Sequence, residues 1–159
     1  MAEELLNRIE KLDNRIAIRV LEFFSARVFE GMETSPEELL EGIPEEYRSQ
    51  VPFERALQMS SSERAQPLPE RESAILAREL LVGFAEDDAF APSLSQALDE
   101  YQDNTLMAGE ILATGVAISM IIIAATTTFK GKVGAFDVAK EVASPELIKS
   151  ILKYFPKLI

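Results

Sequence analysis

The side chains able to carry out acid–base or metal chemistry in this chain are carboxylates, hydroxyls and lysines, because the sequence contains no His and no Cys. Nucleophilic systems of the Ser-His-Asp and Cys-His kinds are therefore excluded, and so are zinc sites built from Cys and His. The densest acidic cluster, Glu86-Asp87-Asp88, lacks the alternating ligands and the distal Glu of a calcium loop. We therefore predict no catalytic residue, no metal site and no cofactor, and an enzyme that depends on carboxylates or lysine is the least favoured hypothesis.

Charge divides the sequence into two parts and argues against nucleic acid as a partner. The net charge is −11, which repels phosphates. Residues 1–104 hold 10 basic and 23 acidic side chains, whereas residues 105–159 hold 6 basic side chains, all lysine, and 4 acidic ones. We predict an acidic helical bundle over 1–104, followed by an apolar helix, a β-hairpin and a terminal helix over 105–159.

Apolar spacing predicts several helices in the first part. Apolar residues recur every three or four positions through 3–30, which favours one long helix. Ser35-Pro36-Glu37-Glu38 has the sequence of a capping box and predicts a short helix that Gly42 ends. Further helices are expected over 45–60 and 70–85, and from Pro92 to about 103. The predicted fold class is mainly α, an irregular helical bundle with a C-terminal β-hairpin and a terminal helix.

An uncharged run from Ile111 to Phe129 has two interpretations. It is long enough for a transmembrane helix at about 109–129. Alternatively it divides into a buried helix near 106–118 and a strand near 120–129, since Ile121 to Phe129 is rich in β-branched residues. We favour the divided interpretation, because a turn at Lys130-Gly131-Lys132 and a return strand over 133–138 then complete a hairpin. Ser144 and Pro145 start a predicted helix that runs to Phe155.

Two short motifs in this second part support a resemblance. Thr126-Thr127-Thr128-Phe129-Lys130-Gly131-Lys132 and Ser144-Pro145-Glu146-Leu147 are similar to small helix-plus-hairpin modules associated with bacterial conflict and signalling effectors. The resemblance implies an association with such an effector, and it assigns no site residue.

The function expected from these features is non-catalytic protein–protein interaction, as an adaptor or a regulatory module. A partner protein or a second copy is expected to contact the hairpin, whose edge can accept a strand. The candidate interaction residues are Ile121, Ile122, Ile123, Phe129, Lys130 and Lys132. The lysines from Lys130 onward are either contacts for an acidic or anionic partner or ordinary solubilising residues.

The expected location is cytoplasmic, because the acidic start of the chain lacks the pattern of a secretory signal. The alternative is a single-span membrane protein, with an acidic helical domain and a span at about 109–129.

Overall fold

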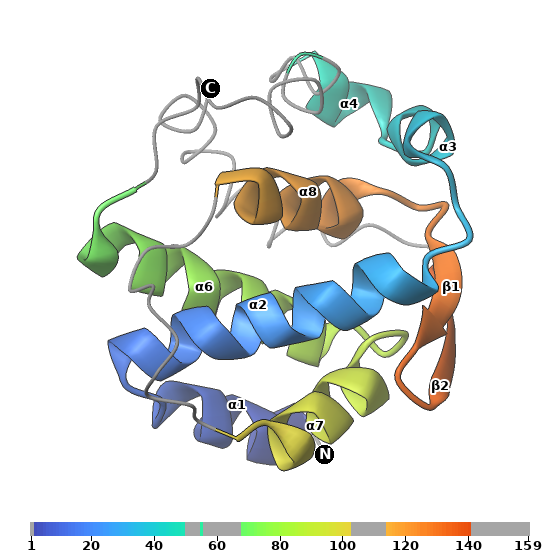
Figure 1. Ribbon diagram of the computed structural model, residues 1–159. Helices are drawn as coiled ribbons and strands as arrows, with labels where there is room; N and C mark the ends of the chain where they lie inside the picture. Colours follow the sequence, from blue (N-terminus) through green and yellow to red (C-terminus); the bar gives the residue numbers. More distant parts are fainter. Residues whose placement is uncertain (1, 50–54, 56–67, 103–113, 141–159) are drawn as a thin grey trace.

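A computed structural model describes residues 2–49, 55, 68–102 and 114–140. Over these residues the fold is mainly α, with seven helices and one C-terminal antiparallel hairpin, as the sequence predicts. The helices are α1 (Ala2–Glu10), α2 (Asn14–Gly31), α3 (Pro36–Glu41), α4 (Glu45–Arg48), α6 (Glu70–Glu86), α7 (Ala91–Glu100) and α8 (Thr114–Ala125). The strands are β1 (Lys130–Val133) and β2 (Phe136–Ala139). Helix α2 crosses the middle of the molecule and ends beside the hairpin (Figure 1).

The single long helix predicted over 3–30 is wrong, because the chain breaks between α1 and α2. Asp13 adopts an extended conformation and its carboxylate accepts a hydrogen bond from the Ile16 amide at 2.8 Å. An Asp that accepts such a bond starts a new helix instead of continuing the previous one. The apolar spacing hides this break, since both helices bury their apolar side chains in the same core.

The capping box predicted at Ser35-Pro36-Glu37-Glu38 is confirmed. Ser35 Oγ accepts the Glu38 amide, and the Glu38 carboxylate accepts the Ser35 amide, which completes the capping box of α3. Tyr47 is buried, as expected, but α4 ends at Arg48, and most of the helix predicted over 45–60 lies outside the described residues. Helices α6 and α7 confirm the predictions over 70–85 and from Pro92.

The strand predicted over 120–129 is wrong, because residues 114–125 form helix α8. The side chains from Met120 to Ala125 are all buried, so this part of the helix is apolar on every side. The sequence of a short, fully buried apolar segment is compatible with a strand and with a helix, since neither then needs a polar face. Helix α8 nevertheless ends at Ala125, so no continuous helix reaches Thr128.

The hairpin forms later in the sequence than expected. Lys130-Gly131-Lys132, predicted as the turn, lies in strand β1, and the turn is Gly134-Ala135. The predicted return strand over 133–138 overlaps β2. The helix predicted over 144–155 lies outside the described residues. Among the helices of the described ranges, none is long and apolar enough to cross a membrane.

Three threonines explain why the chain leaves α8 and turns toward the hairpin. Thr126 Oγ1 donates to the Leu39 carbonyl at 3.0 Å, Thr127 Oγ1 to the Gly42 carbonyl at 2.9 Å, and Thr128 Oγ1 to the Glu38 carbonyl at 2.8 Å. These carbonyls lie at the C-terminal end of α3, where those of Glu38 and Leu39 also accept the Gly42 amide and have room for a second hydrogen bond. The threonines therefore fasten α3 to the end of α8.

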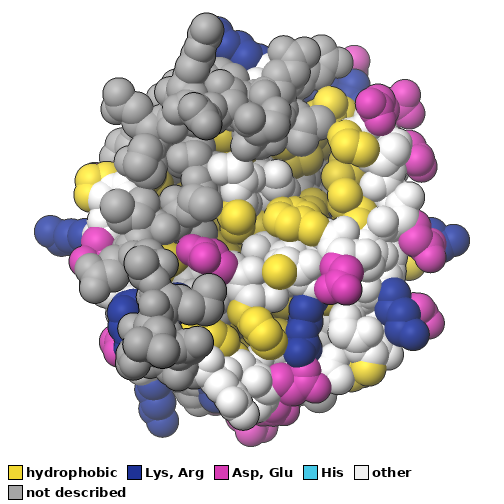
Figure 2. Space-filling model, viewed as in Figure 1, with side chains coloured by type: hydrophobic (Ala, Val, Ile, Leu, Met, Phe, Trp, Pro, Cys, Tyr) yellow, Lys and Arg dark blue, Asp and Glu magenta, His cyan; other side chains and the backbone are white. Residues whose placement is uncertain are grey.

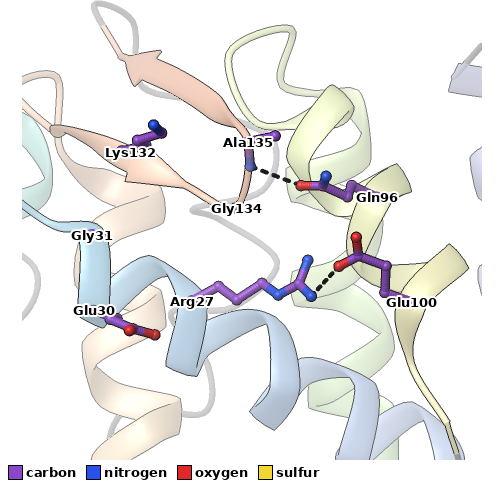
Figure 3. Close-up of a pocket in the computed structure, with 8 residues that line it drawn as sticks. All are labelled: Arg27, Glu30, Gly31, Gln96, Glu100, Lys132, Gly134 and Ala135. Carbon is purple, nitrogen blue, oxygen red and sulfur yellow. Dashed lines mark hydrogen bonds and ion pairs between the residues drawn. The ribbon is translucent and has the colours of Figure 1, made fainter.

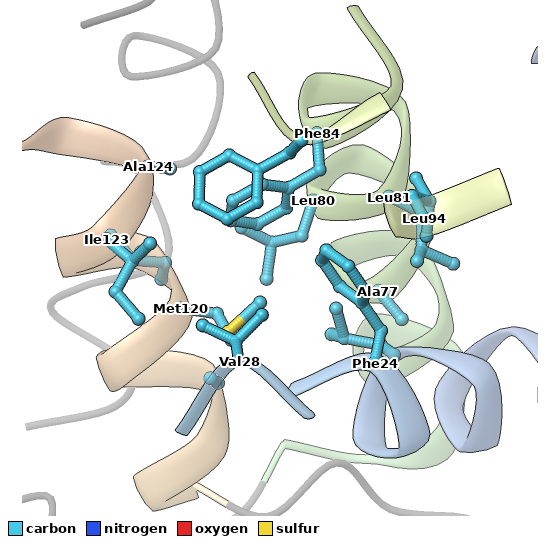
Figure 4. Packing of buried hydrophobic residues seen from close by; sticks show 14 of the residues in the cluster. Phe24, Val28, Ala77, Leu80, Leu81, Phe84, Leu94, Met120, Ile123 and Ala124 are labelled. Atoms are coloured by element: carbon cyan, nitrogen blue, oxygen red, sulfur yellow. The ribbon is translucent and has the colours of Figure 1, made fainter. Parts of the chain in front are cut away.

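One hydrophobic core joins the helices and the hairpin. Met120, Ile123 and Ala124 of α8 face α6 and α2 (Figure 4). Aromatic rings extend the core toward the hairpin, with centroids 4.9 Å apart between Phe84 and Phe90 and 5.1 Å apart between Phe90 and Phe129. The core thus contains residues from both predicted parts, 1–104 and 105–159, whose boundary lies outside the described residues.

Candidate functional site

The hairpin brings together the features of this molecule that are suited to binding. Its register places Lys130 opposite Ala139, Gly131 opposite Val138, Lys132 opposite Asp137 and Val133 opposite Phe136. The Lys140 amide donates to the Phe129 carbonyl at 2.9 Å. Hydrogen-bonded pairs alternate along an antiparallel ladder, so the main-chain groups of Asp137 and Ala139 point away from β1.

The β1 edge of the hairpin is closed by the segment that follows α2. Met32 forms an isolated bridge with Gly131, and the amides of Glu33 and Thr34 donate to the Lys130 carbonyl at 2.9 and 3.2 Å. The approach is so close that a Cβ on Gly31 would overlap the Lys132 carbonyl. Hence β1 cannot accept another strand there.

The β2 edge differs, because no described segment pairs with it. Asp137 and Ala139 are exposed, and the ring of Phe136 at the start of the strand is 38% exposed, although it faces the same way as buried Val133 and Val138. A short strand with outward amides, outward carbonyls and a partly uncovered aromatic ring is the arrangement that accepts an extended peptide.

A buried lysine holds the other end of β2. Lys140 Nζ donates to the carbonyls of Ile123 at 3.1 Å and Ala124 at 2.5 Å, at the end of α8, and lies 3.6 Å from the Asp87 carboxylate. Burial lowers the pKa of Lys140 to about 8, although Asp87 opposes the shift. With its side chain only 2% exposed and these partners in place, Lys140 anchors the hairpin.

The hairpin tip rests on α7. Gln96 Oε1 accepts the Ala135 amide at 2.9 Å, and Gly134 has a positive φ of 61°. A Cβ on Gly134 would overlap the Gln96 oxygen, so glycine meets both the turn geometry and the close approach. The two ends of β2 are thus fixed independently, and among the described residues none pairs with its outer edge.

An open pocket of about 540 Å³ lies beneath this tip, between α2, α7 and the hairpin (Figure 3). Its charged lining residues are Arg27, Glu30, Glu100 and Lys132. Arg27 pairs with Glu100, and its guanidinium lies 4.6 Å from the centre of the Phe23 ring. In the described part of the chain, no group of three or more acidic side chains is arranged to hold a metal ion.

The six candidate interaction residues fall into two groups. Ile121, Ile122, Ile123 and Phe129 are at most 1% exposed and belong to the core, whereas Lys130 and Lys132 are exposed on β1. Lys140, one of the lysines expected from the sequence to be surface contacts or solubilising residues, is buried instead. The sequence did not point to Asp137, Ala139 or Arg27. Their roles depend on strand pairing and on residues distant in the sequence, and no local motif marks them.

Comparisons with protein-family models, with curated proteins and with solved structures found no match to this chain.

Proposed function

We propose that this protein is a non-catalytic interaction module that binds an extended, basic segment of a partner protein along the exposed edge of β2. The observation that carries the proposal is the difference between the two edges of one hairpin. The β1 edge is closed by residues 31–34, while the β2 edge presents the main-chain groups of Asp137 and Ala139. Strand addition uses such groups for affinity and alternate side chains for specificity.

Charge favours a basic partner over a second copy of this chain. Asp137 is the one charged side chain of β2; Lys130 and Lys132 share its exposed face but lie on β1, one strand further from the open edge, and the protein as a whole has a net charge of −11. Two copies joined edge to edge would bring two acidic molecules together, and their Asp137 side chains would add to the repulsion. A lysine or arginine on an added strand is attracted by both charges.

The partner must also cover an exposed apolar side chain. Phe136 is one of two large apolar side chains that are clearly exposed among the described residues, and it lies at the tip end of β2. A strand added beside β2 would direct alternate side chains to the same face as Phe136. The partner segment is therefore expected to alternate, with apolar side chains on that face and basic ones on the other.

The test uses two peptides of equal length, one alternating valine and lysine and one alternating valine and glutamate. Binding to the full chain is followed by ¹H–¹⁵N NMR and by amide hydrogen exchange. We expect the lysine peptide to bind, to slow exchange at Asp137 and Ala139, and to lose affinity in about 0.5 M salt. The glutamate peptide is expected not to bind.

The decisive variant is Ala139→Pro, which removes an outward amide without removing a hydrogen bond of the hairpin. Its matched control is Ala139→Thr, which keeps that amide and suits a strand. We expect only the proline variant to lose binding, with thermal melting of all proteins followed by circular dichroism. Equal binding by the folded proline variant would overturn the proposal.

A further inference from the structure

The pocket beneath the hairpin tip is built around an arginine that is held in place from two sides. Arg27 donates through Nη2 to the Glu100 carboxylate and stacks on Phe23 at 4.6 Å. Its Nη1 is buried, and no described residue accepts a hydrogen bond from it. Figure 3 shows the guanidinium between Gly134 and Glu100, under the turn. Arg27 is thus a fixed positive charge at the pocket wall, and its Nη1 can still donate hydrogen bonds.

Two further donors line the same pocket. Gln96 uses its oxygen to accept the Ala135 amide, so its NH₂ group remains available as a donor. Lys132 extends from β1 on the exposed side of the hairpin and belongs to the pocket rim. These groups come from α2, α7 and β1, and their common chemistry suits a carboxylate.

Acceptors balance these donors. Glu30 is exposed at the end of α2, lines the pocket, and forms no ion pair with Lys132 or with any other residue of the described ranges. Glu100 has a second carboxylate oxygen beside the one that accepts from Arg27. An acidic side chain and a basic one therefore face a single pocket without neutralising each other.

From this arrangement we propose that the pocket binds a small zwitterionic molecule of the amino-acid or short-peptide class. Its carboxylate is received by Arg27, Gln96 and Lys132, and its ammonium group by Glu30 and Glu100. A simple anion meets two carboxylates and a molecule of net charge −11, and a simple cation meets the arginine and the lysine. A volume of about 540 Å³ accommodates a ligand of this size.

The pocket and the open β2 edge are separate sites. The pocket is bounded by Lys132, Gly134 and Ala135 on the hairpin, whereas the edge depends on Asp137 and Ala139. The proposal for the pocket consequently stands or falls independently of the proposed function, and the Ala139→Pro variant is expected to bind the small ligand normally.

The test screens common free L-amino acids and glycylglycine by ¹H–¹⁵N NMR against the full chain. Acetate and methylammonium serve as the separate halves of a zwitterion, and N-acetylated amino-acid amides serve as uncharged forms. We expect at least one zwitterion to bind and to shift the amides of Gly134 and Ala135, while the halves and the blocked forms do not. Equal binding of acetate alone, or no binding by any zwitterion at millimolar concentration, would overturn the assignment.

Exposed positions provide variants that are expected to fold. Glu30→Gln and Lys132→Met each remove one charge from the pocket, and each is expected to weaken binding by about tenfold. Glu33→Gln and Lys130→Met are the matched controls, because Glu33 is exposed just after α2, Lys130 is exposed on β1, and neither lines the pocket. Unchanged binding in both pocket variants would also contradict the proposal.

Discussion

At the scale of single residues, Lys140 stands out because a charged amine is buried where the hairpin meets the helices. Its partners are two carbonyls at the end of α8 and the Asp87 carboxylate. Cations are favoured at a helix C-terminus, but removal from water disfavours the charged form. Burial has the larger effect here, and it lowers the pKa of Lys140 from 10.5 to about 8.

This lowered pKa predicts a pH-dependent contribution to stability. Between pH 8 and 10.5 the unfolded chain keeps the proton on Lys140 that the folded chain has released, so folding becomes more favourable as pH rises. The contribution is fully present above the unfolded value and is lost as pH falls through about 8. The full change is about 3 kcal/mol, at 1.36 kcal/mol for each unit of pKa.

Lys140→Met isolates this contribution, because methionine does not titrate. We expect the free energy of unfolding of the unchanged protein to rise relative to that of the variant across pH 8 to 10.5, measured by urea denaturation at a series of pH values. Below this range the difference between the two proteins should be constant. Parallel curves throughout would show that Lys140 titrates alike in the folded and unfolded chains.

At the scale of secondary-structure elements, α8 decides how the molecule is assembled. It lies against α6 and α2 (Figures 1 and 4), and its six consecutive side chains from Met120 to Ala125 are all buried. The buried residues Ile121, Ile122 and Ile123 are consecutive, so they cover about three fifths of a helical turn. A helix without a polar face is stable only when its whole surface is covered.

Aspartate in place of either Ile121 or Ile122 is therefore expected to unfold the protein. Both positions are fully buried, and an unpaired carboxylate there costs more than about 4 kcal/mol, a large part of a typical domain's stability. Circular dichroism should show the helical signal lost in both variants. Ser119→Asp is the control on the same helix, at a partly exposed position, and should cost less.

If one of the two isoleucine variants kept its helical signal while its molecular mass changed, that side of α8 would instead contact another chain. Light scattering on the same samples distinguishes these outcomes. The comparison also tests the interaction residues expected from the sequence, because four of the six lie in this core.

At the scale of the whole molecule, the charge of the sequence changes near residue 104, but one hydrophobic core joins the described residues on both sides of it. Acidic and basic side chains are interspersed over the face seen in Figure 2, with apolar side chains between them. Inside, Leu80 and Phe84 of α6 meet Met120 and Ile123 of α8 in one cluster. The change in composition near residue 104 therefore does not coincide with a separation between hydrophobic cores.

Residues 1–104 expressed alone are accordingly expected not to fold cooperatively. Removal of α8 and the hairpin exposes Val28, Leu80 and Phe84, which are buried against them, and leaves α2 and α6 without their cover. The full chain should show one sharp thermal transition, and the fragment a broad one or none. A fragment with its own sharp transition would establish 1–104 as an independent domain.

The sequence by itself determined the features that depend on neighbouring residues. The capping box at Ser35 and Glu38 is fixed within one turn, and apolar spacing over 70–85 and Pro92 in the first turn of α7 predicted those two helices. The mainly α class with a late hairpin followed from the same local signals. The lack of His and Cys likewise limited the available chemistry before any fold was known.

Only the tertiary structure decided the identity of α8, the break at Asp13 and the features suited to binding. Residues 120–125 are compatible with a helix or a strand, and the packing of α6 and α2 around them favours the helix. Residues 31–34 close the β1 edge, so β2 is the edge that the described residues leave unpaired, and Arg27, Gln96 and Lys132 come together at the pocket from three different elements. Such contacts join residues far apart in the sequence, so local sequence patterns do not predict them.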